Sequence, residues 1–254
     1  SSVRQTTDAA GGRDPTARMV AGSAAMNIVV TGANRGIGLE FVRQYLARGE
    51  RVVAAVRDPA SAEALHALGA AHPGHLRVLA CDVGDDASVA AFARELGAEA
   101  VDVLVNNAGM RDEWASLEAV TTEEALRVYS VNALGPVRVT RALLPNLLKA
   151  GTRKVVHISS GMGSIGDNRS GGAYAYRMSK AALNMASRNL ANDLRDRDVV
   201  SVVFNPGWVQ TDMGGPSAPL AVGASVRALV GLIDGLTLAE SGSFLNWSGK
   251  VYEW

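Results

Sequence analysis

The chain alternates between short apolar runs and longer segments with helical spacing, beginning at Met26. The runs are MNIVVT (26–31), RVVAAVR (51–57), LRVLACDV (76–83), VDVLVNN (101–107), RKVVHISS (153–160) and VVSVVFNPG (199–207), and a shorter one is SGSFLNWSG (241–249). Because they are apolar at consecutive positions, they predict strands buried on both faces, as in a parallel sheet covered by helices. The alternation predicts one α/β domain over residues 26–254, with a doubly wound parallel sheet of about seven strands and helices on both faces.

Between the runs lie segments that favour helices, at 36–49, 59–70, 85–98, 121–151, 173–196 and 225–236. The longest of them carries Pro136, which removes one helical hydrogen bond and predicts a kink near Asn132. Residues 1–25 are small and polar and lack the apolar stretch of a secretion signal. They are expected to be a flexible N-terminal extension or a tag remnant, with Met19 and Met26 as candidate starts.

The composition argues against several classes of function. Twenty-five basic and 25 acidic residues give a net charge of zero, which disfavours nucleic-acid and anionic-membrane partners. The only cysteine, Cys81, permits no disulfide within the chain and suits a reducing cytoplasm. The four histidines form no ligand cluster in the sequence, so no metal site is expected, and no apolar run approaches the roughly 18 residues of a membrane span.

A glycine-rich segment, TGANRGIG (31–38), follows the first predicted strand and opens the first predicted helix. Such a turn lets the backbone approach a pyrophosphate, and the helix N-terminus offers free N–H groups. NAD-binding sheets place an acidic residue at the end of the second strand, but this chain has Val56 and then Arg57. The guanidinium groups of Arg57 and Arg35 suit a 2′-phosphate, which favours NADPH over NADH. Asp58 leaves open that Arg57 is neutralised locally.

A second motif is GGAYAYRMSKAALN (171–184), which holds one of only four lysines in the chain. Tyr176 and Lys180 are four residues apart and share a helix face, whereas the residue four after Tyr174 is Met178. A nearby cation lowers the tyrosine pKa from its usual value of about 10. Lysine also brings three rotatable donors, which suit ribose hydroxyls better than the rigid fork of arginine. The pair therefore predicts a tyrosine that gives a proton to a carbonyl oxygen.

TGANRGIG, NNAG (106–109), ISS (158–160), YRMSK (176–180) and NPGWVQT (205–211) occur in this order. Together they resemble the short-chain dehydrogenase/reductase family over residues 26–254, and in particular its C-factor and sniffer-type carbonyl reductase branch. The resemblance implies a Rossmann fold and NADPH-dependent reduction of a ketone or an aldehyde to an alcohol.

The resemblance also implies residue roles. Tyr176 is the expected general acid, Lys180 binds the nicotinamide ribose and lowers the tyrosine pKa, Ser160 holds the carbonyl oxygen, and Asn132 fixes a water in a proton relay to Lys180. The expected cofactor-binding residues, besides Tyr176 and Lys180, are Gly32, Asn34, Arg35, Gly36, Ile37, Gly38, Arg57, Asp82, Val83, Asn106, Ala108, Gly109, Pro206, Gly207, Val209 and Thr211.

The serine departs from the family spacing, which is about thirteen residues before the tyrosine. Ser160 lies sixteen residues before Tyr176, and Ser164 lies twelve before it. Ser160 is preferred because it ends a predicted strand, and three extra residues in DNRSGG (167–172) account for the spacing. Ser164 remains the alternative, with a loop-capping hydroxyl as its other interpretation.

Four apolar side chains in loops that should border the cleft, those of Trp114, Met162, Trp208 and Met213, predict an apolar or aromatic carbonyl substrate. The short segment after Thr211 argues against a long lid. Family resemblance implies a homodimer or a homotetramer. Two other functions stay open: a nucleotide-binding signalling protein of the C-factor type with little turnover, and an NAD-dependent alcohol dehydrogenase.

Overall fold

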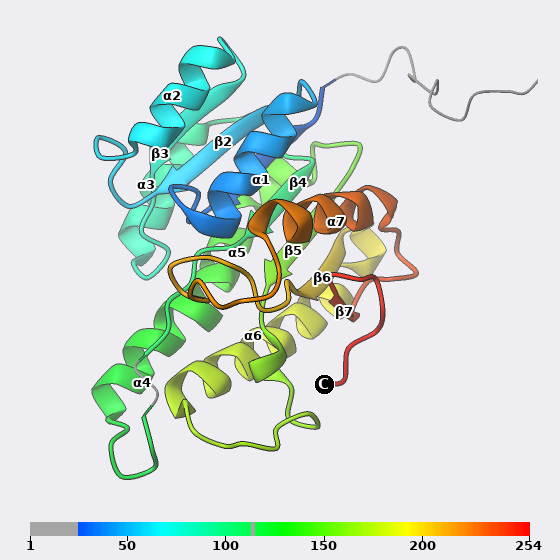
Figure 1. Cartoon of the computed structure of the whole chain (residues 1–254). Coiled ribbons are helices and arrows are strands. Elements are labelled where there is room, and N and C mark those ends of the chain that lie inside the picture. The colour runs from blue at the N-terminus through cyan, green and yellow to red at the C-terminus, as the bar shows by residue number, and fades with distance from the viewer. Residues whose placement is uncertain (1–24, 113–114) are drawn as a thin grey trace, which may run out of the picture.

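A computed structural model describes residues 25–112 and 115–254, and its core is one sheet of seven parallel strands in the order β3-β2-β1-β4-β5-β6-β7 (Figure 1). The register is continuous at the centre, where Ile28 of β1 pairs with Val52 on one side and Val103 on the other. The predicted doubly wound sheet is confirmed. The strands are β1 (Asn27–Thr31), β2 (Arg51–Val56), β3 (Leu76–Ala80), β4 (Val103–Asn106), β5 (Lys154–Ile158), β6 (Val200–Asn205) and β7 (Phe244–Asn246).

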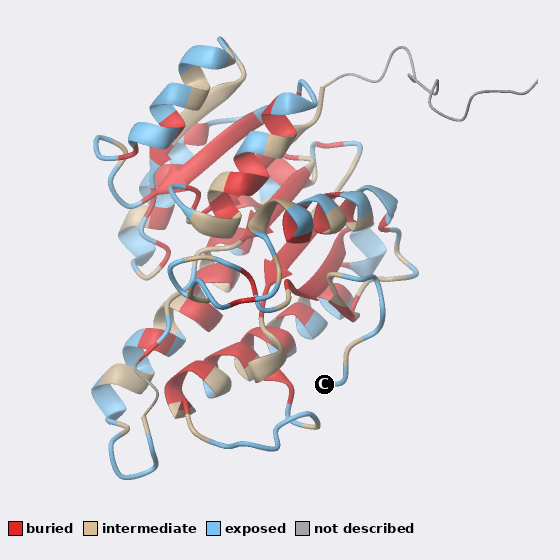
Figure 2. Cartoon of the chain, in the orientation of Figure 1, coloured by how far each residue is buried: buried red, intermediate tan, exposed pale blue. Residues whose placement is uncertain are grey.

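Helices cover both faces of this sheet. Side chains of α1 (Gly36–Ala47), α2 (Glu63–Ala71) and α7 (Val222–Gly235) share one apolar cluster with Val30. Those of α3 (Asp86–Leu96), α5 (Gly135–Leu147) and α6 (Tyr174–Asp193) share the other with Val29. Neighbouring residues of one strand thus enter opposite cores, because successive side chains on a strand point to opposite faces. Figure 2 shows the central strands buried along their length.

The segment predicted as one long helix is divided into three parts. It consists of α4 (Thr122–Tyr129), the π-helical turn η1 (Ser130–Leu134) and α5. The Gly135 N–H donates to Ser130 O, five residues earlier, and Pro136 follows in the first turn of α5, where its missing N–H costs least. A kink was predicted near Asn132, and the structure has the π-helical turn at this position, a feature that is frequent at functional sites.

Several element boundaries differ from the prediction, among them the start of the second helix and the end of the last strand. The second helix was expected to begin at Pro59, but α2 begins at Glu63, because Asp58 Oδ1 accepts the Ala60 N–H (3.1 Å) and holds a separate turn there. The last strand is shorter than its apolar run. After β7 the chain turns, and Val251 comes back to form an antiparallel bridge with Leu245.

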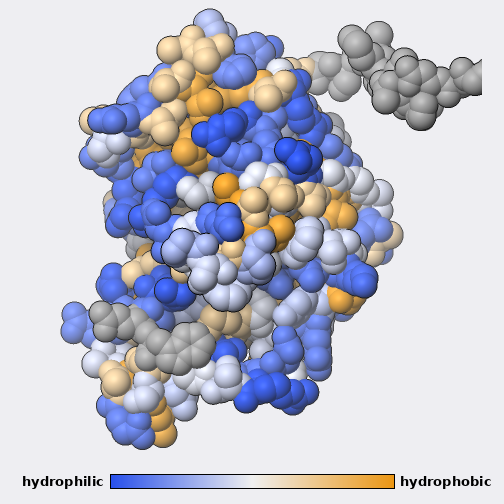
Figure 3. Space-filling model, viewed as in Figure 1, coloured by the Kyte–Doolittle hydropathy of each residue, from blue (hydrophilic) through white to orange (hydrophobic). Residues whose placement is uncertain are grey.

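Within the described part of the chain, no helix combines the length and hydrophobicity that a membrane span needs, and no cluster of three potential metal ligands occurs. Polar residues cover most of the face in Figure 3, where apolar residues form several small groups, one of them near α4. Since all seven strands run in parallel, their carboxyl ends meet at one edge, which is where ligands bind in such sheets.

Candidate active site

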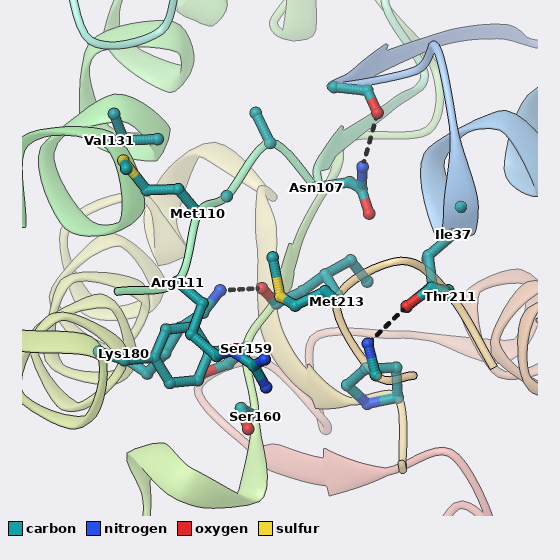
Figure 4. A pocket seen from close by; sticks show the side chains of 18 of the residues that line it. Ile37, Asn107, Met110, Arg111, Val131, Ser159, Ser160, Lys180, Thr211 and Met213 are labelled. Carbon is teal, nitrogen blue, oxygen red and sulfur yellow. Dashed lines mark hydrogen bonds between the residues drawn. The ribbon is translucent and has the colours of Figure 1, made fainter. Parts of the chain in front are cut away.

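A cleft of about 1560 Å³ opens along the carboxyl ends of the strands. This volume exceeds the roughly 300–1,000 Å³ of a pocket for one small ligand. Figure 4 shows Lys180, Ser160 and Arg111 toward one end, and Ile37 and Thr211 toward the other. Most of the predicted site residues line it: Gly32, Asn34, Arg35, Gly36, Ile37, Arg57, Asp82, Val83, Ala108, Gly109, Ser160, Met162, Tyr176, Lys180, Pro206, Gly207, Trp208, Val209, Thr211 and Met213.

Among the described residues, three of those predicted do not line this cleft: Gly38, Asn106 and Asn132, which are all buried. Trp114 lies outside the described residues.

The glycine turn packs so tightly that it needs glycine. Gly32 has φ of 64°, and a Cβ there would lie 2.7 Å from the Ala108 Cα. Gly36 has φ of 53°, and its missing Cβ would point into the space before Thr211, 3.4 Å from that side chain. The turn therefore leaves room in front of the α1 N-terminus, where no side chain caps the free N–H groups. The space and its donors fit a pyrophosphate.

Asn107, which sequence reasoning missed, ties this turn to β4. Its amide donates to Thr31 O (3.0 Å) and Gly32 O (3.1 Å), and its backbone N–H donates to Thr31 Oγ1 (3.1 Å). Asn106, which was predicted to contact the cofactor, instead points into the core, where its amide donates to Thr140 Oγ1 (3.1 Å). The motif NNAG marked the right strand end, and the alternation of side chains along the strand selects the second asparagine for the cleft.

Behind Asn106 lies a buried histidine. The side-chain amide nitrogen of Asn106 is 3.4 Å from His157 Nδ1, and His157 Nε2 is 3.3 Å from Ser201 Oγ. Burial, and next the charge of Lys180, lower the pKa of His157 to about 3. The ring is therefore neutral at physiological pH, and its role is to link Asn106 and Ser201 inside the core.

The opposite end of the cleft carries the two predicted arginines. Arg57 is exposed and also lines an adjoining cavity of about 270 Å³ with Asn34, Asp58 and Ser61. Arg35 donates to Asp212 Oδ2 (3.3 Å), which links the glycine turn to the loop after β6. Asp58 makes no ion pair with Arg57 among the described residues, so that guanidinium faces the cavity as a cation. Asp82 also lines the cleft, with Oδ1 accepting the Gly84 N–H (2.8 Å).

At the reactive end, Tyr176 and Lys180 are both almost fully buried on α6. Lys180 Nζ lies 5.7 Å from the Tyr176 ring centroid and donates to Ile158 O (2.9 Å) at the end of β5. Ser160 Oγ accepts the Met162 N–H (3.1 Å), and Ser160 and Tyr176 both line the cleft. The helix and the end of β5 thus bring the phenol, the hydroxyl and the ammonium group into one corner.

The pKa shifts at this corner differ from the expectation in one respect. Burial raises the pKa of Tyr176, opposed by the hydrogen bond from Ser160 and the charge of Arg111. Lys180 is not among the groups that lower it. Burial also lowers the pKa of Lys180 to about 8. Tyr176 is therefore protonated at neutral pH, as a proton donor must be.

Asn132, in η1, holds the segment after β4 that lines the site. Its Oδ1 accepts the Met110 N–H (2.8 Å), and its Nδ2 donates to Met110 O (2.8 Å) and Ser179 Oγ (3.0 Å). A Cβ on Gly109 would lie 3.4 Å from Asn132 Oδ1 and 3.6 Å from Lys180 Nζ, so both groups converge on Gly109. The proton relay through a water at Asn132 stays a prediction.

The structure separates the two candidate serines. Ser160 lines the cleft, whereas Ser164 is buried outside it and its Oγ accepts the Asp167 N–H (3.0 Å). Ser159 donates to Asn184 Oδ1 (2.7 Å). The intervening residues of the loop 164–173 account for the longer serine–tyrosine spacing. The geometry favours Ser160 and assigns Ser164 the loop-capping interaction.

The walls around this corner are less apolar than predicted. Met162, Trp208 and Met213 line the cleft as expected. The lining residues that sequence reasoning missed here include Met110, Arg111, Asp167, Arg177 and Tyr252. Arg177 lies within YRMSK and Asp167 within DNRSGG, but neither was predicted to line the site. The other three lie outside the motifs, and separate loops, α6 and the segment after β7 bring all five together.

Comparison with known proteins connects this geometry to a family. Residues 26–219 match the family model for short chain dehydrogenase. The C-signal of Myxococcus xanthus is 50% identical over 164 residues, which cover 65% of this chain and 99% of that protein. The NADPH-bound carbonyl reductase from chicken fatty liver is 36% identical with a TM-score of 0.86, covering 91% and 99% of the two chains. The carbonyl reductase Sniffer of D. melanogaster is 33% identical with a TM-score of 0.87, covering 91% and 100%.

Proposed function

This chain belongs to the short-chain dehydrogenase family, and we propose that it is an NADPH-dependent oxidoreductase that reduces a ketone or an aldehyde to an alcohol. One observation carries the proposal: Tyr176, Ser160 and Lys180 lie together in a cleft that continues to an uncapped helix N-terminus and to Arg57. The carbonyl reductases of similar structure support the same chemistry.

When bound, NADPH would supply the hydride that the carbonyl carbon accepts. Ser160 donates a hydrogen bond to the carbonyl oxygen, and Tyr176 gives that oxygen its proton as negative charge develops there. The ammonium group of Lys180 would hold the nicotinamide ribose through its rotatable donors. The glycine turn and the α1 N-terminus would hold the pyrophosphate of NADPH, and Arg57 would hold its 2′-phosphate.

The test of this function is a steady-state assay of NADPH oxidation with a panel of aliphatic and aromatic aldehydes, ketones and diketones. Steady turnover with at least one of them, giving the corresponding alcohol, is the expected result. Product analysis by chromatography separates carbonyl reduction from slow oxidation of NADPH by oxygen.

Arg57→Ala is expected to reduce the preference for NADPH over NADH by about 10- to 100-fold, because a hydrogen bond to a charged group contributes roughly 1.5–3 kcal/mol. The measurement is the ratio of kcat/KM for the two cofactors. Arg51→Ala is a suitable control, since Arg51 is exposed at the opposite end of β2. An unchanged ratio in Arg57→Ala would remove this side chain from cofactor selection and reopen the NAD-dependent alternative.

The similarity to the C-signal favours a second candidate function. In that case the chain binds a nucleotide as a signalling protein and turns over little. The complete set of Asn132, Ser160, Tyr176 and Lys180 argues for catalysis. Tight NADPH binding by calorimetry, together with no turnover across the carbonyl panel, would favour the signalling function instead.

We also propose a homo-oligomer that works in the cytoplasm. Large apolar side chains are exposed on α4, η1 and α6, among them Leu126, Leu134, Met178 and Met185. Pairing with a second copy would remove them from water. Sedimentation equilibrium is expected to give a dimer or tetramer mass, and a monomer mass at micromolar concentration would contradict it. The free, buried Cys81 suits a reducing compartment.

A further inference from the structure

The segment formed by residues 250–254 runs back along β7 and is fixed against the sheet edge. The Tyr252 N–H donates to Phe244 O (2.7 Å), and the Asn246 N–H donates to Lys250 O (2.7 Å). The ring of Phe244 lies 5.0 Å from the Tyr252 ring and 5.5 Å from the Trp254 ring, between centroids. These contacts set the position of the Tyr252 side chain before any ligand binds.

This segment contacts the loop that carries Ser160. Gly166 N–H donates to Trp254 O (2.8 Å), and the Tyr252 hydroxyl donates to Asp167 Oδ2 (2.8 Å). A Cβ on Gly161 would lie only 2.6 Å from the Tyr252 oxygen. Because Gly161 directly follows Ser160, the Tyr252 phenol lies beside the serine that would hold the substrate carbonyl.

Tyr252 and Asp167 both line the cleft, and together they present acceptors to it. Burial, and next the contact with Asp167, raise the pKa of Tyr252 to about 12, so the phenol keeps its proton. The phenol donates that proton in its hydrogen bond to Asp167 Oδ2. Within the described residues, the carboxylate accepts no other side-chain hydrogen bond, so Oδ1 and the lone pairs of the phenol oxygen remain available.

A ligand that binds to the acceptor groups of Tyr252 and Asp167 must supply a hydrogen-bond donor. A hydroxyl group suits this pair better than an ammonium group, because Arg111, Arg177 and Lys180 also line the cleft and repel a cation.

We propose that Tyr252 and Asp167 form a specificity-determining acceptor pair that binds a hydroxyl group of the substrate while Ser160 and Tyr176 engage its carbonyl oxygen. The inference rests on the proposed carbonyl reductase function and narrows its substrate class to hydroxylated carbonyl compounds. Tyr252 and Asp167 act here on substrate selection rather than on proton transfer.

The experiment compares the 2-, 3- and 4-isomers of hydroxymethylbenzaldehyde with the ethylbenzaldehydes of the same pattern, which match them in size but lack the hydroxyl. For wild type, kcat/KM is expected to favour the hydroxymethyl compound for at least one isomer. Tyr252→Phe keeps the ring contacts with Phe244, and it is expected to reduce that ratio about tenfold, as is Asp167→Ala. Tyr129→Phe, in a tyrosine outside the cleft, is the matched control and should keep the wild-type ratio.

The outcomes distinguish a failure of the acceptor pair from a failure of the proposed carbonyl reductase function. If wild type reduces both compounds of every pair equally well, the acceptor pair is refuted while carbonyl reduction stands. If Tyr252→Phe slows both compounds by the same factor, the residue supports the fold rather than the choice of substrate, and the inference is likewise overturned. If wild type reduces none of the aldehydes, other carbonyl compounds in the panel decide the proposed function separately, and hydroxylated members of that panel repeat the comparison.

Discussion

Tyr176→Phe is expected to lower kcat for carbonyl reduction by about 10³-fold or more, because it removes the proton that the developing alkoxide requires. The phenol is buried beside Ser160, and its raised pKa keeps it protonated at neutral pH. Phenylalanine fills the same space without the hydroxyl, so the packing of α6 is retained. The measurement is NADPH oxidation under saturating substrate, with NADPH affinity followed by fluorescence.

The control for this variant is Tyr174→Phe. Tyr174 lies two residues before Tyr176 on α6 and does not line the cleft. The variant should therefore retain wild-type kcat and thermal stability. NADPH affinity is expected to persist in both variants. Normal turnover by Tyr176→Phe would show that another group supplies the proton, and the mechanism proposed above would be wrong.

The parallel, doubly wound sheet could be predicted from the sequence because several independent patterns indicated it. Consecutive apolar residues marked strands such as Val103–Asn106, and each glycine or asparagine at a strand end marked the same edge. Helix periodicity selected Tyr176 rather than Tyr174, and the structure places only Tyr176 in the cleft. Such patterns can be interpreted from the sequence alone because they depend on residues that are close together in the chain.

Other features depended on contacts that the sequence does not express. Asn106 and Asn107 differ by one position, and only the pleat of β4 decides which of them faces the cleft. Tyr252 forms a hydrogen bond with Asp167, which is 85 residues away in the sequence, and no short motif predicts this contact. The direction of the Tyr176 pKa shift also required the structure, because burial outweighs the groups that favour the charged form.

Lys180→Arg is expected to lose most of the activity, by about 10²- to 10³-fold, although it preserves the positive charge. The side chain is packed on all sides: a Cβ on Gly163 would lie 2.8 Å from Lys180 Cβ, and one on Gly109 would lie 3.6 Å from Nζ. The ammonium group already donates to Ile158 O (2.9 Å). A planar guanidinium is larger and longer than the ammonium group, so it would displace this backbone or the neighbouring phenol.

The matched control is Lys154→Arg. Lys154 Nζ donates to Ile233 O (2.8 Å) and Asp234 O (2.9 Å) at the end of α7, outside the cleft, so this substitution should leave kcat near wild type. Thermal unfolding of both variants separates a loss of chemistry from a loss of fold. Full activity in Lys180→Arg would mean that charge alone is required and that the donors and the compact shape of lysine are not.

A pH profile adds a readout that a purely structural role of Lys180 would not produce. Burial lowers the pKa of this lysine to about 8, and the reaction uses its charged form. As pH rises through that value the lysine loses its proton, so wild-type kcat/KM for reduction should be level near neutral pH and fall above about 8. The residual activity of Lys180→Arg should not fall in this range, since arginine stays charged. A wild-type profile without this decline would show that the reaction does not need the charged form of Lys180, because Tyr176 remains protonated over the same range.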